Sequence, residues 1–214
     1  MPNYTDITGL AGVASAMAAS LLLLPWSKRL NGKPLVLATG AVFVVALIPF
    51  NGFPLAAYVR GATGDLSITT LTLLWCALLG PLSNTRPGCG VANSGHRLAL
   101  LALIALAAVA LYPMALGLGA FDPYRLGFGN VLFVAALLLV ALAAWLRKNH
   151  LVALCISVAA LAWATGYYES GNLWDYLLDP FVSIYALSVL LMRAVKAMVT
   201  RGGPGRAECN RQDA

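Results

Sequence analysis

The stretch YYESGNLWDYLLDPFVSIYALSVLLMRAVK, residues 167–196, decides how this chain is expected to fold. Its first half carries three acids among Tyr and Trp side chains, and its second half is an apolar run that ends in Arg193 and Lys196. Aromatic residues are enriched where a transmembrane helix meets the membrane surface, and Lys and Arg are enriched on its cytoplasmic side. This stretch therefore predicts a membrane crossing that enters from the outer face and ends in the cytoplasm.

The whole chain has the composition of a membrane protein. Of its 214 residues, 60% are hydrophobic and only 10% are charged, whereas soluble domains are about 25% charged. A transmembrane helix needs about 20 mainly apolar residues, so this length allows roughly seven or eight crossings and leaves no room for a separate soluble domain. We therefore expect an all-α, polytopic membrane protein.

Apolar windows of near-span length recur along the chain. They predict a compact bundle of seven transmembrane helices that forms a single domain over residues 1–199. The windows fall at about residues 7–26, 34–50, 66–82, 98–117, 130–146, 151–168 and 180–197. The remaining residues, 200–214, are polar and rich in Gly and Arg, and we expect them to form a disordered basic tail.

The connections between windows alternate in charge. Those after the first, third and fifth windows carry only basic residues, and those after the second, fourth and sixth carry acids. The positive-inside rule places the basic connections in the cytoplasm, so we expect the N-terminus outside and the C-terminus inside. Of the eight acids, all except Glu208 and Asp213 then face outward. No Lys or Arg precedes the first window, which predicts a retained helix and not a signal peptide.

Several polar residues stand where outward-facing helices begin. Asp179 followed by Pro180 is typical of an N-cap with proline at the first helical position. Asp6, Asp65 and Asn130 precede other windows, and a carboxylate there also meets the positive end of the helix dipole. We interpret these four residues first as helix caps.

The outer connections also carry a candidate binding site. Arg60 is expected to pair with Asp65 across a Gly-rich turn and to form an anion site beside a helix N-terminus. The alternative is a turn that only returns the chain to the membrane, and Asp122 likewise reads first as the start of a turn. The full candidate set for an outward-facing pocket is Tyr58, Arg60, Asp65, Asp122, Tyr124, Arg125, Glu169, Asp175 and Asp179.

Two carboxylates of this set offer a second chemistry. If the last helix begins near Trp174, then Asp175, Asp179 and Ser183 lie on one helix face. Two adjacent carboxylates could hold a cation or divide general acid and base roles, because their pKa values are pushed apart. The alternative is that Asp179 caps the helix and Asp175 is solvated at the membrane surface.

Motifs for metals and catalysis are lacking. His96 and His150 both fall in cytoplasmic connections, so no pair of histidines in one span could ligate haem. Cys89 shares a loop with His96, but no third group is present to orient a nucleophile and base pair. Charges are absent from the apolar centres of the windows, which weighs against an ion pathway through the bilayer. We expect no metal and no cofactor.

These observations favour an accessory or scaffolding subunit of a larger membrane complex. Its partners would be another membrane protein and, at the cytoplasmic face, anionic lipid headgroups. The net charge of +6 is explained by topology, so we expect no nucleic-acid partner. The alternatives are a transporter or solute-binding subunit with an outward-facing pocket, and a membrane-embedded enzyme acting on a lipid-linked substrate at the outer leaflet. Ala/Leu-rich spans and short loops favour a bacterial cytoplasmic (inner) membrane.

Overall fold

The computed structural model describes residues 4–21, 24–25, 33–79 and 94–202, and this part of the chain is all-α apart from one short hairpin. The long helices are α1 (Tyr4–Leu21), α2 (Lys33–Leu47), α4 (Ile68–Leu79), α5 (Ser94–Ala115), α6 (Val131–Leu146), α7 (His150–Ala164) and α9 (Pro180–Gly202). The short helices are α3 (Leu55–Thr63), α8 (Leu173–Leu177) and the 3-10 helix η2 (Pro123–Gly127). The strands β1 (Pro49–Phe50) and β2 (Phe53–Pro54) pair antiparallel, with Pro49 opposite Pro54 and Phe50 opposite Phe53.

The predicted all-α class is confirmed, and each predicted apolar window overlaps one long helix. The helix ends differ from the predicted ends. α2 ends at Leu47 and not near residue 50, because the chain turns into the hairpin there, with Asn51 and Gly52 at positive φ. α9 continues to Gly202, past the predicted start of the tail at Thr200. Residues 203–214 and most of the loop that contains Cys89 lie outside the described residues.

Two of the described helices are long and apolar enough to cross a membrane. They are α5, over Gly95–Ala115, and α9, over Pro180–Thr200. Four further helices are apolar but shorter, namely α2, α4, α6 and α7. The bundle of seven crossings is therefore not established by helix length, and the number of crossings stays a prediction.

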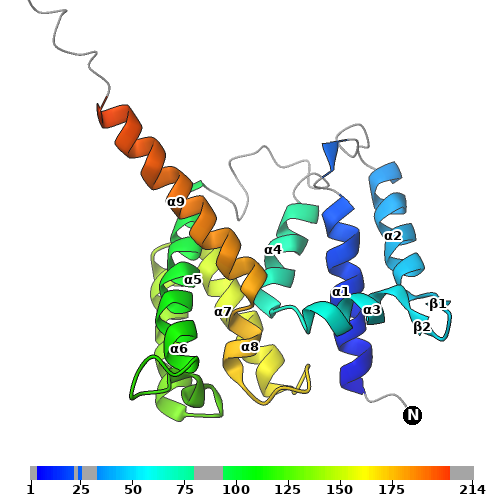
Figure 1. The fold of residues 1–214 in the computed structure, drawn as a ribbon, viewed down its shortest axis with the longest axis horizontal. Coiled ribbons are helices and arrows are strands. Elements are labelled where there is room, and N and C mark those ends of the chain that lie inside the picture. Colours follow the sequence, from blue (N-terminus) through cyan, green and yellow to red (C-terminus); the bar gives the residue numbers. More distant parts are fainter. Residues whose placement is uncertain (1–3, 22–23, 26–32, 80–93, 203–214) are drawn as a thin grey trace, which may run out of the picture.

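The described helices pack in two groups, each around its own core. In the smaller group, α1 packs against α2 and α3 around Val13, Ala14, Ala46 and Ala56. In the larger group, α7 lies at the centre and contacts α4, α5, α6 and α8, while α5 also packs along α9. Contacts between α1 and α4 join the two groups (Figure 1).

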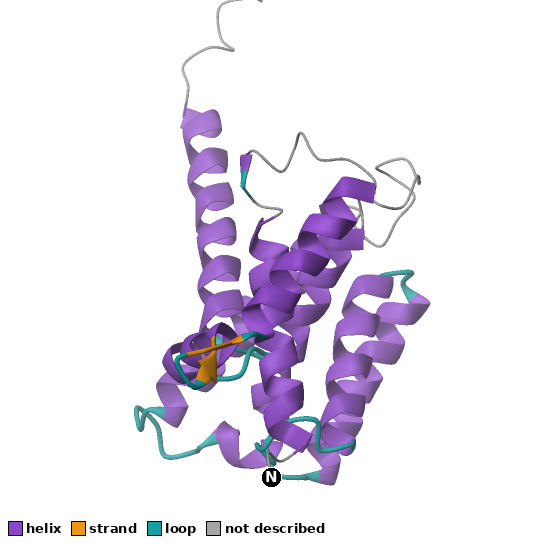
Figure 2. Cartoon of the chain, turned by 90° about the vertical axis from the view of Figure 1, so that its right-hand side faces the viewer, coloured by secondary structure: helices purple, strands orange, loops and turns teal. Residues whose placement is uncertain are grey.

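The two ends of the molecule differ in structure and in charge. α8 and the N-terminal end of α1 lie at one end, and α9 finishes at the opposite end (Figures 1 and 2). Asp122, Asp175 and Asp179 lie at the α8 end, Asp175 within α8 itself, whereas Arg193 and Lys196 lie in the second half of α9. We call the α8 end the acidic end.

Candidate functional site

At the acidic end, Arg60 is held by two carboxylates. This arginine lies in the last turn of α3. Its Nε and Nη2 donate to Asp65 Oδ1 and Oδ2 at 2.6 and 3.0 Å, and its Nη1 donates to Asp6 Oδ1 at 3.2 Å. These hydrogen bonds, chiefly those to Asp65, raise the pKa of the Arg60 guanidinium well above its usual range. The predicted pairing of Arg60 with Asp65 is confirmed, and the additional bond from Arg60 to Asp6 ties α3 to α1.

The ion pair lies directly against the backbone of α1 at Gly9. A Cβ atom added to Gly9 would lie 2.5 Å from Asp65 Oδ1 and 2.7 Å from Arg60 Cζ. Any larger residue would push the pair away from the helix. The guanidinium already donates hydrogen bonds to two carboxylates, Asp65 and Asp6. The geometry therefore favours an ion pair that stabilises the fold over the predicted anion site.

Asp179 connects the start of α9 with the start of α4. Its Oδ1 accepts from the backbone N–H of Val182 at 2.8 Å, which is an N-cap interaction. Its Oδ2 accepts from the backbone N–H and the hydroxyl of Ser67, at 2.9 and 2.8 Å, and from the hydroxyl of Thr70. The predicted cap is confirmed. With Asp179 only 4% exposed, these four hydrogen bonds fill the usual acceptor capacity of a carboxylate.

Asp175 is bound by hydroxyl groups from two loops. Tyr124 Oη lies 3.0 Å from both carboxylate oxygens, and the Ser170 hydroxyl donates to Oδ2. Burial, aided by the charge of Asp175, raises the pKa of Tyr124 to about 12. The prediction that Asp175 and Asp179 share one helix face is wrong, because α8 ends at Leu177 and Leu178 is extended before α9 begins.

A network of side chain to backbone hydrogen bonds fixes the loops around Asp175. Asn172 caps α8 by accepting from Trp174 N at 3.0 Å, and its Nδ2 donates to the Tyr124 carbonyl at 3.0 Å. Trp174 Nε1 donates to the Pro123 carbonyl at 3.0 Å. Asn172 is fully buried against Gly127, where an added Cβ would lie 1.6 Å from Asn172 Oδ1. Two loops about 50 residues apart in the chain are thus locked together.

Three carboxylates of the predicted pocket line one small cavity. It has a volume of about 280 Å³, and its lining residues are Asp65, Tyr168, Ser170, Asp175, Leu178, Asp179 and Pro180. The structure therefore brings Asp65, Asp175 and Asp179 to a common space. Sequence reasoning did not identify Tyr168, whose hydroxyl donates to the Leu66 carbonyl at 2.8 Å, or Ser170.

The other predicted pocket residues do not line this cavity. Asp122 caps η2 by accepting from Tyr124 N at 2.9 Å, which confirms the predicted turn start. Tyr58 is half exposed beside Phe53, and Arg125 and Glu169 are exposed. The nine predicted pocket residues therefore do not form one site. Some cap helices, some form an ion pair, some line the cavity and some are exposed.

The cavity offers limited chemistry. Within the described part of the chain, no group of three or more His, Cys, Asp or Glu side chains is placed to hold a metal ion. Likewise, no buried side-chain nitrogen or oxygen of the described residues lacks a hydrogen-bond partner. A catalytic or ligating site needs groups that are free to meet a substrate, whereas these carboxylates already accept hydrogen bonds from the protein.

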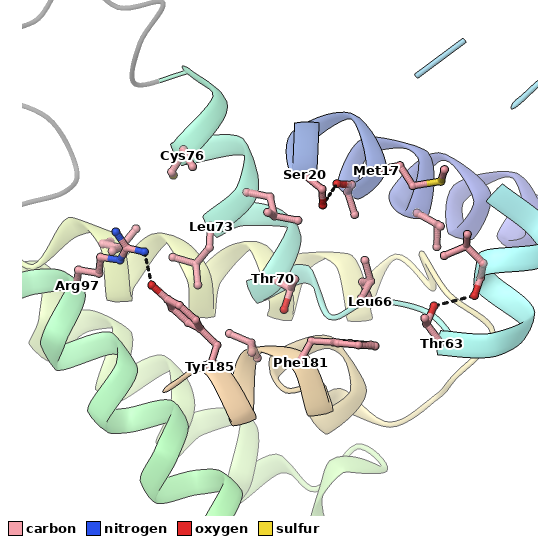
Figure 3. Close-up of a pocket in the computed structure, with 17 residues that line it drawn as sticks. Met17, Ser20, Thr63, Leu66, Thr70, Leu73, Cys76, Arg97, Phe181 and Tyr185 are labelled. Carbon is pink, nitrogen blue, oxygen red and sulfur yellow. Dashed lines mark hydrogen bonds between the residues drawn. The ribbon is translucent and has the colours of Figure 1, made fainter. Parts of the chain in front are cut away.

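A second, larger and mainly apolar cavity lies between the two helix groups (Figure 3). Sequence reasoning missed it, because its walls come from helices that are distant in the chain. The sequence signal for it is Arg97, a basic residue that directly precedes the apolar window at 98–117.

Comparisons with known proteins give no relative, since no protein-family model, curated protein or solved structure matches this chain.

Proposed function

We propose that this chain is a multi-pass protein of a bacterial inner membrane, whose seven long helices cross the bilayer with the N-terminus outside. The exposure of α6 supports the membrane location. Leu132 and Leu139 are 80% and 65% exposed, and Ala141 is the one buried residue of this apolar helix. A soluble protein would bury a helix that is hydrophobic on every side, whereas lipid would cover it.

The two longest apolar helices support the same location. Only 33% of the span window in α5 and 17% of that in α9 is buried, so neither resembles the core helix of a soluble protein. The shorter helices α2, α6 and α7 have 15 or 16 residues, which corresponds to about 23 Å. Their crossings would need adjoining residues or a locally thinner bilayer.

Within the membrane, the proposed role is that of an accessory or scaffolding subunit of a larger complex. The observation that supports this proposal is that the outer-face carboxylates accept hydrogen bonds from groups of their own chain. Asp65 binds Arg60, Asp175 binds Tyr124 and Ser170, and Asp179 binds two helix starts. These groups stabilise the loops of their own chain, as expected of a protein whose function depends on its shape and surface.

A solute-binding or transport role is the second candidate. The observation that favours it is the cavity of about 280 Å³, because three carboxylates share its wall. A small cation or a polar neutral solute would fit its size and charge. The membrane-embedded enzyme acting on a lipid-linked substrate stays a prediction.

Native mass spectrometry distinguishes the two candidates. The protein would be extracted from its source membrane in lipid nanodiscs, without strong detergent. An accessory subunit is expected to be released with a partner protein in a fixed ratio. A lone protomer would contradict the accessory role. A lone protomer that retains a small solute, and loses it in Asp175→Asn, would support solute binding in the cavity of about 280 Å³.

A further inference from the structure

The larger cavity has the size of a site for a single amphiphile. Its volume is about 750 Å³, within the range of roughly 300–1,000 Å³ that is typical of small-molecule sites. The cavity is too small for a helix of a partner protein, because four turns of a helix about 10 Å wide would need on the order of 1,700 Å³. The walls are formed mainly by apolar side chains of α1, α4 and α9, among them Met17, Leu73 and Phe181 (Figure 3).

One charged side chain, itself exposed, lines this mainly apolar cavity. Of the described residues that line the cavity, Arg97 is the one Lys, Arg, Asp or Glu residue. It reaches in from the first turn of α5, donates from Nη2 to Tyr185 Oη at 2.6 Å and lies 5.9 Å from the centre of that ring (Figure 3). Thr63 marks the opposite end of the cavity. The cavity therefore combines a long apolar wall with one cationic end.

The chain offers Arg97 little negative charge. In the part that the structure describes, the ion pairs are those of Arg60 with Asp6 and Asp65, at the acidic end. The segments 22–32 and 80–93 contain no Asp or Glu in their sequence. Apart from Glu208 and Asp213, which lie outside the described residues, no acid of the chain is left to pair with Arg97, because none of the described acids forms an ion pair with it.

We infer that this cavity binds an anionic membrane phospholipid, with one acyl chain along the apolar wall and the headgroup phosphate at Arg97. A guanidinium binds a phosphate through two parallel hydrogen bonds. The Tyr185 hydroxyl accepts from Arg97 and still has a proton to donate to a phosphate oxygen. The inference depends on the proposed membrane location and not on the accessory role.

The experiment titrates the full-length protein in mild detergent with phosphatidylglycerol or phosphatidylcholine of identical acyl chains, and counts bound lipid by native mass spectrometry. The wild-type protein is expected to prefer phosphatidylglycerol. Arg97→Gln should weaken phosphatidylglycerol binding by about fivefold, which corresponds to one basic residue at a membrane surface, and should leave phosphatidylcholine unchanged. Arg97→Lys keeps the charge and should retain part of the preference.

Two further variants separate the headgroup site from the apolar wall. Ala77→Trp, which fills the cavity beside Cys76, should reduce the binding of both lipids equally. Arg193→Gln removes an exposed arginine of α9 that does not line the cavity, and it should change neither lipid.

Three results would overturn the inference. The first is a wild-type protein without lipid preference. The second is an equal loss in Arg97→Gln and Arg193→Gln, which would indicate general attraction to the headgroup. The third is a preference for phosphatidylglycerol that Arg97→Gln leaves unchanged, because Arg97 would then not contact the headgroup. This conclusion holds whether or not Glu208→Gln and Asp213→Asn, which remove the two acids near the C-terminus, alter the preference. An accessory subunit with seven crossings and a partner protein could give any of these three results. Failure of the lipid-binding inference can therefore be distinguished from failure of the proposed accessory role.

Discussion

At the scale of single residues, Gly127 sets the distance between two outer loops. Because an added Cβ would lie 1.6 Å from Asn172 Oδ1, we expect Gly127→Ala to force the loops apart and to destabilise the protein by about 1–3 kcal/mol. The melting temperature in detergent measures this loss. Gly171→Ala is the matched control, because an added Cβ there meets nothing within 4 Å. Equal melting temperatures for the two variants would contradict the packing at Gly127.

Tyr124 gives the molecule a pH dependence at alkaline pH. Its pKa is raised to about 12 in the folded protein, by burial first and then by the charge of Asp175, from about 10 in an unfolded chain. A raised pKa contributes stability that is fully present below about pH 10 and is lost as the pH rises towards about 12. Melting temperatures between pH 9 and 12 should therefore fall more steeply for the wild-type protein than for Tyr124→Phe.

The comparison with Tyr124→Phe isolates the effect of one phenol, because the other tyrosines are the same in both proteins. The variant also loses the hydrogen bond to Asp175 and should be less stable at pH 9 by about 1.5–3 kcal/mol, the usual value for a charged acceptor. Parallel pH curves for the two proteins would contradict the raised pKa.

At the scale of secondary-structure elements, Asp179 is both a cap and a connection. Asp179→Ala would remove the cap of α9 and leave the buried groups of Ser67 without their acceptor. We expect a loss of about 2–4 kcal/mol. Asn130→Ala is the control, because Asn130 caps the exposed helix α6 alone, and it should cost about 1 kcal/mol. Equal losses, measured by thermal unfolding, would show that the connection to α4 contributes nothing.

The same elements show what the sequence could predict. The caps at Asp179 and Asn130 and the Arg60 to Asp65 pair depend on residues that are close in the chain, so their spacing carried the signal. The interpretation of Asp6 as a cap is wrong, because Asp6 lies in the first turn of α1 and its carboxylate binds Arg60. The sequence leaves the break between α8 and α9 open between two alternatives, because Asp179 followed by Pro180 is typical of a helix start, whereas Leu177 and Leu178 continue an apolar run. In the structure Asp179 caps α9, and α8 is fixed beside η2 by the bonds of Asn172 and Trp174, which join residues about 50 positions apart.

At the scale of the whole molecule, the two cavities were also beyond sequence reasoning. The acidic cavity combines α8, the start of α9 and the loop before α4, and the apolar cavity lies between the two helix groups. Composition predicted helices with apolar surfaces, but which surfaces face each other depends on packing angles that the sequence does not state.

The membrane topology is the claim on which every proposal depends, and cysteine accessibility tests it directly. Single cysteines would be placed at Ala62 and Gly171, and at Lys148 and Thr200, in a variant whose four native cysteines are replaced by alanine. In intact cells, a membrane-impermeant maleimide should label the first pair alone, and in inverted vesicles the second pair alone. Labelling of all four positions from one side, or recovery of the protein without detergent, would contradict the proposed seven crossings.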